Sequence, residues 1–206
     1  MDILRIIKIN LRHNFLPHLL IAVLIAFLTP AAFQISALDF RSSAQPLEML
    51  LSLSGAVLFT PVFLPEQNVG IRDTVRSKKA DYLGIYALRA AYSAVFLAVL
   101  IGMFAAVMKL FECNVTVSHF AAGYASAMFL GAVGFAAAGI TGSATAGYMA
   151  AMMYYIANFG LKDKLGIFFI FNMYFSGSSS SSPGLITASV CIIMLTLLWL
   201  KIRDKV

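Results

Sequence analysis

Long apolar stretches separated by short polar ones dominate the pattern of this 206-residue chain. A helix needs about 20 residues to cross the ~30 Å hydrocarbon core of a bilayer, and six stretches approach that length. They run approximately from Phe15 to Ser36, Pro46 to Leu64, Gly84 to Leu110, His119 to Ile140, Gly142 to Phe159 and Leu185 to Leu200. The pattern predicts an all-α integral membrane protein with six transmembrane helices in one domain, residues 1–206.

Only the break Ile140-Thr141-Gly142-Ser143 separates the fourth and fifth stretches, which predicts a helical hairpin because the combined run is too long for one crossing. Small residues recur at every fourth position around this break. They are Gly123, Ala127 and Gly131, followed by Gly139, Ser143, Gly147 and Ala151. This spacing lets helix backbones approach closely, so we expect tight helix packing there.

The stretch from Leu165 to Phe175 has eleven residues, too few to cross a bilayer, and is predicted to be a re-entrant or interfacial element. Its aromatic residues favour the headgroup level, and the serine run from Ser178 to Ser182 cannot bury apolar surface and is expected to be mobile. Residues 161–184 are therefore predicted to form a short aromatic helix at the outer mouth and a flexible return loop.

Composition supports the membrane class, because 61% of the residues are hydrophobic and 12% are charged. Lysine and arginine gather in three clusters, which six spans would place on one side. The clusters are Arg5, Lys8 and Arg12; Arg72, Arg76, Lys78 and Lys79; and Lys201, Arg203 and Lys205. The positive-inside rule makes that side cytoplasmic. This predicts a multi-pass plasma-membrane protein with both termini inside. The net charge of +6 fits attraction to anionic membrane lipids, so no nucleic acid partner is expected.

Residues 1–12 place apolar and basic side chains on different helical faces, which favours an amphipathic interfacial helix. The alternative is a plain flank of the first span. Between the second and third spans, Pro65 to Leu83 is the one substantial polar segment. In a helix, Arg72, Arg76 and Lys79 would form one basic stripe. Taken alone, this pattern also fits an ordinary solvated loop.

Several kinds of chemistry have no sequence signal. The chain lacks a Gly-x-x-x-x-Gly-Lys-Ser/Thr phosphate loop, paired carboxylates within the spans and a metal-binding cluster. Ser143 has one candidate base in its half of the chain, His119, which the topology places across the membrane, so no enzyme activity is expected. Glu48 and Arg89, at span margins, are expected to snorkel toward water. No disulfide is expected, because the two cysteines lie at different predicted depths.

The motif Glu66-x-x-x-Gly70 is followed by a charged stretch through Ser77, Lys78 and Lys79, and a re-entrant stretch precedes the last span. With these features, the amphipathic first helix and the six spans, the chain has a resemblance to the permease subunits of type-2 ABC exporters, the ABC-2 family. It implies that residues 65–83 contain a cytoplasmic coupling helix that contacts an ATPase subunit. The residues implied in this contact are Glu66, Gly70, Arg72, Arg76, Ser77, Lys78 and Lys79.

By this resemblance, the chain is expected to be a permease subunit that moves an amphipathic solute, such as a peptide, drug or lipid. A separate ABC ATP-binding subunit would bind ATP and Mg²⁺, with no cofactor in this chain, and a second permease chain would complete the path. One alternative is a membrane-embedded immunity or accessory protein that binds a partner without transport. Another is an intramembrane enzyme, which the missing catalytic cluster disfavours.

Overall fold

The computed structural model describes residues 14–67 and 82–203, and every regular element among them is helical. In chain order they are α2 (Leu16–Phe33), η2 (Pro46–Leu50), α3 (Leu53–Phe59), η3 (Thr60–Phe63), α4 (Leu64–Gln67), α6 (Tyr82–Leu110), α7 (Val117–Thr141), α8 (Ala144–Gly160), α9 (Lys162–Leu165), η4 (Gly166–Phe168), α10 (Asn172–Ser176) and α11 (Ser182–Arg203). Of these, η2 is a π-helical turn, and η3 and η4 are 3-10 helices. The predicted all-helical class is confirmed.

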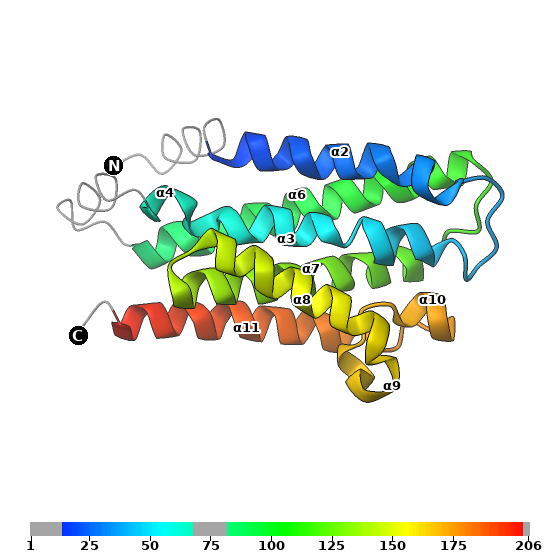
Figure 1. Ribbon diagram of the computed structural model, residues 1–206. Helices are drawn as coiled ribbons and strands as arrows, with labels where there is room; N and C mark the ends of the chain where they lie inside the picture. Colours follow the sequence, from blue (N-terminus) through cyan, green and yellow to red (C-terminus); the bar gives the residue numbers. More distant parts are fainter. Residues whose placement is uncertain (1–13, 68–81, 204–206) are drawn as a thin grey trace.

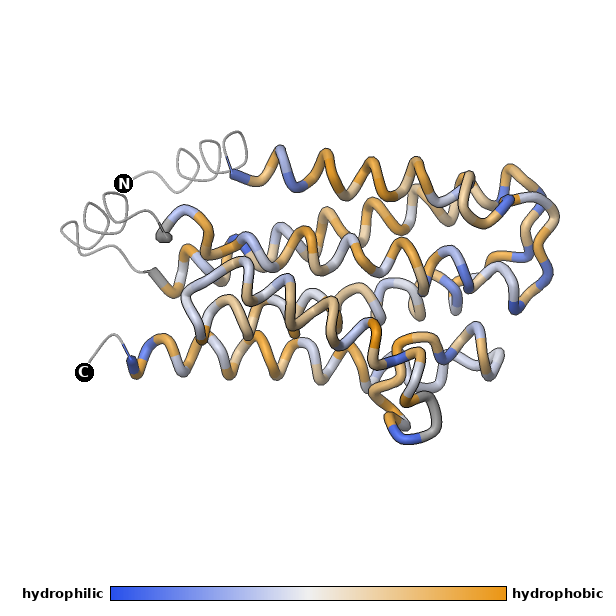
Figure 2. Tube along the Cα trace, viewed as in Figure 1, coloured by the Kyte–Doolittle hydropathy of each residue, from blue (hydrophilic) through white to orange (hydrophobic). Residues whose placement is uncertain are grey.

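The helices lie side by side in one elongated bundle (Figure 1). The beginnings of α2 and α6 and the ends of α4 and α11 share one end of this bundle, which we call the termini end. The loops 34–45 and 111–116 and the segment 161–181 lie at the opposite end, the far end. Hydrophobic residues dominate the length between the ends, and hydrophilic residues gather toward the ends themselves (Figure 2). This distribution suits a bundle whose middle is surrounded by lipid.

Within the described ranges, five helical stretches are long and apolar enough to cross a membrane. They are Leu16–Phe33, Pro46–Phe63, Leu83–Leu110, Val117–Thr141 and Ser182–Arg203. The fifth predicted stretch, Gly142 to Phe159, corresponds to α8, which has 17 residues and a length of about 25 Å, short of the ~30 Å hydrocarbon core. The chain is thus a membrane-embedded helical protein, but the count of six full spans is not confirmed. The difference arises because α8 ends at Gly160 and the chain then turns into the short helices α9 and η4.

The hairpin between α7 and α8 is present where the sequence predicts it. Gly142 follows α7 with a φ of 71°, a left-handed conformation that glycine adopts without steric cost. Its N–H donates to the carbonyl of Ala138 at 2.9 Å and closes the end of the helix. Ser143 then precedes the first residue of α8 in an extended conformation. Two antiparallel helices result from this single turn.

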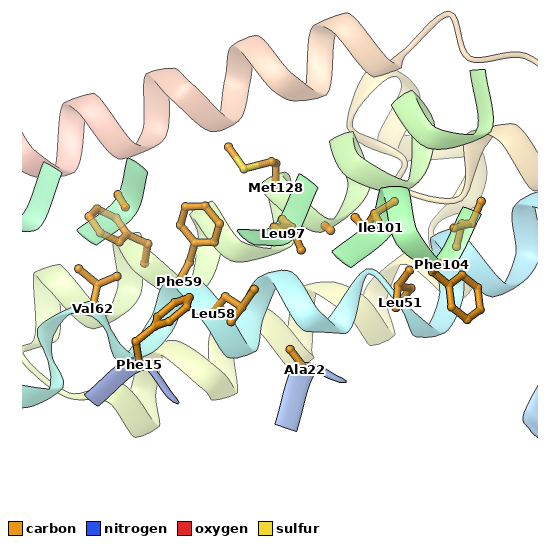
Figure 3. Close-up of a cluster of buried hydrophobic side chains, with 14 of the residues drawn as sticks. Phe15, Ala22, Leu51, Leu58, Phe59, Val62, Leu97, Ile101, Phe104 and Met128 are labelled. Carbon is orange, nitrogen blue, oxygen red and sulfur yellow. The ribbon is translucent and has the colours of Figure 1, made fainter. Parts of the chain in front are cut away.

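The centre of the bundle is formed by α7 and the second span, which consists of η2, α3 and η3. Of their membrane-crossing windows, 67% and 78% of residues are buried, against 11% for α2 and 28% for α6 and for α11. Figure 3 shows side chains from four parts of the chain meeting in this core, including Phe15, Leu58, Leu97 and Met128. The remaining helices surround this central pair and present much of their apolar surface outward.

Glycine makes the crossing of α3 and α7 close. A methyl group added at Gly55 would overlap the backbone carbonyl of Ala127. One added at Gly131 would lie 2.8 Å from the carbonyl oxygen of Gly55, and one at Gly123 would lie 3.1 Å from Cβ of Leu47. The expected small-residue stripe on α7 is therefore confirmed as the surface on which the second span packs.

The second expected stripe of small residues, from Gly139 to Ala151, takes part in contacts between two different pairs of helices. An added methyl group at Gly147 would lie 2.6 Å from the Gly134 carbonyl oxygen, so this part joins α8 to α7. One at Gly139 would lie 2.8 Å from Cγ2 of Thr196, which joins α7 to α11. Ser143 does not belong to a helical stripe, because it lies in the turn just before α8.

Candidate functional site

The predicted coupling segment falls largely outside the described residues. This applies to Gly70, Arg72, Arg76, Ser77, Lys78 and Lys79, and also to the predicted amphipathic helix of residues 1–12. The backbone of Glu66 lies in α4, but its side chain is also outside the described part. The proposed ATPase contact therefore stays a prediction. The structure does place both flanks of the segment, Gln67 and Tyr82, at the termini end (Figure 1).

Arg89 of α6 connects these two flanks. Its Nη1 donates a hydrogen bond of 2.7 Å to the carbonyl oxygen of Val62 in η3, just before α4. The residue is 7% exposed, and its guanidinium lies 5.9 Å from the ring centroid of Tyr86. The expectation that Arg89 snorkels to water is therefore wrong. The 3-10 turn offers a backbone carbonyl, and the buried guanidinium hydrogen-bonds it instead of water.

A second hydrogen bond runs parallel to this one. Ser93, one helical turn further along α6, donates its hydroxyl to the carbonyl of Leu58 at 3.1 Å. A small cavity of about 10 Å³ lies beside the two contacts, lined in part by Arg89, Tyr92 and Pro61, and has room for about one water molecule. Two side chains of α6 thus bind the second half of the second span, at Leu58 and Val62.

Glu48 occupies a second polar site, near the far end. It lies in the π-helical turn η2 and is 1% exposed. One carboxyl oxygen accepts the N–H of Met173 at 3.0 Å and the other accepts the N–H of Tyr174 at 2.9 Å. These are amides of the first turn of α10, whose early N–H groups lack partners within the helix. Glu48 therefore does not snorkel as expected, because it satisfies backbone donors 125 residues away.

Three other polar side chains hold the same part of the chain, residues 161–181, which we call the returned segment. Ser126 of α7 donates to the carbonyl of Ile170 at 2.5 Å, and the amide oxygen of Asn158 accepts the Ile170 N–H at 3.1 Å. Tyr154 donates its hydroxyl to the carbonyl of Phe168 at 2.5 Å. The backbone of the returned segment is thus hydrogen-bonded by side chains of η2, α7 and α8.

The aromatic residues of the returned segment divide between core and surface. Phe169 and Phe171 are 4% and 0% exposed, whereas Phe168 and Phe175 are 49% and 39% exposed. The expectation that these rings all lie at headgroup level is only partly met. The buried pair packs with Leu185 and Phe129 in a separate hydrophobic cluster, because α8 ends early and leaves that volume to the returned segment.

His119 is buried by structural contacts. Its Nε2 lies 2.6 Å from the carbonyl of Phe40, and its Nδ1 accepts the N–H of Thr116 at 3.1 Å. Ser143 lies at the other end of the 25-residue α7, about 36 Å away by helical rise. The two residues cannot form a nucleophile and base pair. His119 instead fixes the start of α7 against the loop 34–45.

Sequence reasoning did not identify Ser126, Tyr154 or Asn158. The available signal was weak: Asn158 is a polar residue inside an apolar span, four positions after Tyr154, and buried polar groups in spans are often functional. In the part of the chain that the structure describes, no three His, Cys, Asp or Glu side chains form a possible metal site, and both cysteines are free. No family model, curated protein or solved structure matches this chain.

Proposed function

We propose that this protein is a permease subunit of an ATP-driven exporter. In this proposal the termini end faces the cytoplasm, and residues 65–83 contact a separate ATP-binding subunit that supplies ATP and Mg²⁺. A second permease chain completes the path for an amphipathic solute. α8 and the returned segment together complete a sixth pass through the plasma membrane.

The observation that carries the proposal is the position of the flanks of residues 68–81. They emerge at the same end as the basic end of α11, where Lys201 and Arg203 lie exposed. Between these flanks, Arg89 and Ser93 of α6 bind the carbonyl groups of Val62 and Leu58 in the second span. A displacement of the charged segment would therefore be transmitted to the second span, part of the central helix pair, through these two hydrogen bonds. A plain topological loop has no need of such an attachment.

The proposal is tested by copurification and labelling. The chain, coexpressed with ATPases encoded beside it, is expected to copurify with one of them and with a second permease chain, and to bind no nucleotide alone. A thiol introduced at Lys78 is expected to resist impermeant reagents added to intact cells. Ready labelling from outside would reverse the orientation. Stable copurification with a non-ATPase partner alone would instead favour an immunity or accessory protein.

A further inference from the structure

The last turn of α11 carries an exposed arginine, Arg203, that is held back against the bundle. Its guanidinium carbon lies 4.8 Å from the centroid of the Trp199 ring, one turn earlier on the same helix. Its Nη1 donates a long hydrogen bond of 3.5 Å to the carbonyl of Ile140, near the end of α7. An arginine at a helix end can extend into water. Here two contacts with the protein fix the direction of the cation instead.

Both contacts have an electrostatic cause. The face of an indole ring attracts a guanidinium group, and the last carbonyl groups of α7 have no amide partner within their helix and favour a nearby cation. A ring and a carbonyl group carry no formal charge, so neither contact removes the attraction of Arg203 for an anion. The guanidinium group also has five N–H donors, of which one is directed at Ile140.

The surface beside Arg203 is apolar and faces outward along α11. Leu198 and Ile202 are 53% and 66% exposed on this helix, and Trp199 is 40% exposed. Tryptophan favours the boundary between hydrocarbon and headgroups, which places Arg203 at headgroup level at the termini end, where hydrophilic residues end α11 (Figure 2). A cation next to an outward apolar stripe matches a molecule that has an anionic group and hydrocarbon chains.

We propose that the end of α11, with the adjoining end of α7, forms a binding site for the phosphate group of an anionic phospholipid. Arg203 donates N–H groups to the phosphate oxygens, because the planar guanidinium fits two of them at once. Trp199 positions Arg203, and the acyl chains lie along Leu198 and Ile202. The site requires only that the bundle spans a membrane, and it does not depend on the proposed transport.

Tryptophan fluorescence tests the site, because Trp199 is the one tryptophan of the chain. The full chain is reconstituted in bilayers of phosphatidylcholine and phosphatidylglycerol in equal parts, with bromine on the acyl chains of one lipid or the other. Bromine quenches the fluorescence when its lipid contacts the ring. Phosphatidylglycerol is expected to be preferred about fivefold, as for one cation next to an anionic headgroup. Equal quenching by the two lipids would overturn the site.

Two charge-removing variants separate this site from general attraction to a basic helix end. Arg203→Gln is expected to abolish the preference for phosphatidylglycerol. Lys201→Gln removes the same charge from the same end of α11, where Lys201 is exposed, but about 200° around the helix from Arg203. Within the described residues, Lys201 makes neither of the two contacts, and its removal is expected to leave the preference intact. An equal effect of both variants would contradict a defined site.

Arg203→Lys guards against a folding defect in Arg203→Gln. It keeps the charge but lacks the planar group, and is expected to lose about half of the preference. An unchanged preference would show that charge alone is sufficient and would overturn the positioned site. Glycerol phosphate added to the wild-type chain distinguishes a lipid from a soluble phosphate. It is expected to leave quenching by brominated phosphatidylglycerol unchanged, whereas displacement of the lipid would rule out a lipid as the specific ligand.

Discussion

The crossing of α3 with α7 and the buried part of the returned segment are held differently, because side-chain hydrogen bonds add to hydrophobic packing in the returned segment. At the crossing, Gly55 and Gly131 bring two backbones into direct contact, so packing fills the interface. In the returned segment, Glu48 and Asn158 accept hydrogen bonds from the buried backbone N–H groups of Met173 and Ile170. Adding an atom between two helix backbones in direct contact disrupts their van der Waals packing. Side-chain hydrogen bonds, in contrast, can break and form again. We call the crossing, which is held by packing, the fixed centre, and the returned segment, which also depends on side-chain hydrogen bonds, the hydrogen-bonded end.

The strongest way to break the fixed centre is Gly55→Leu. Its side chain would overlap the Ala127 carbonyl, and a backbone atom cannot move aside by changing rotamer. We expect a loss of about 3 kcal/mol in stability, the upper part of the usual range for overpacking, seen as a lower midpoint of thermal unfolding in detergent. Gly160→Leu is the control, because an added methyl group there meets nothing within 4 Å. Equal stability of the two variants would contradict the close crossing.

Arg89→Met tests a polar contact between α6 and the second span, next to the fixed centre. The substitution leaves the buried Val62 carbonyl without its 2.7 Å donor, which costs about 1–3 kcal/mol. We expect lower thermal stability and weaker association with the ATPase, since the contact lies beside the proposed coupling segment. Arg89→Lys keeps a cationic donor and is expected to recover part of both. Full stability of Arg89→Met would show that the contact contributes little.

Asn158→Ala examines the hydrogen-bonded end. It removes the acceptor of the Ile170 N–H, for which we expect about 1 kcal/mol of local destabilisation. Hydrogen exchange should rise at Ile170 and its neighbours and stay unchanged at the crossing of α3 and α7. Ser189→Ala serves for comparison, because this buried serine bonds only the Leu185 carbonyl of its own helix. A uniform rise in exchange would mean that the two regions unfold together.

The smallest effect on either region is expected from reversing charge at Arg72 and Arg76 together. Exposed ion pairs contribute about 0.2–1 kcal/mol each, so stability and hydrogen exchange should not change. Copurification with the ATPase should nevertheless decrease, because these residues belong to the proposed contact. Reversal at Lys201 and Lys205 is the matched control with equal charge change. The same normal association in both variants would reduce residues 65–83 to a topological loop.

Much of the scaffold could be predicted because its signals are local. Hydropathy identified five of the spans, Gly142 marked the hairpin, and the spacing of Gly123 and Gly131 marked the packing face of α7. The length of the fifth predicted span, Gly142 to Phe159, was overestimated, because hydropathy alone does not show where a helix will end in favour of other packing. The predicted ATPase contact, from Glu66 to Lys79, lies in or beside residues 68–81 and stays a prediction.

The sequence by itself determined the membrane class, the helical class and which helix faces carry the small residues that allow close packing. Only the tertiary structure decided what Glu48, Arg89 and Asn158 bind. Glu48 pairs with Met173 and Tyr174, and Arg89 with the Val62 carbonyl, which are backbone groups with no side-chain signature. Hydropathy and helical periodicity depend only on residues that lie within a few helical turns of one another along the chain. A hydrogen bond across 125 residues depends instead on how η2, α7 and α8 pack around the returned segment.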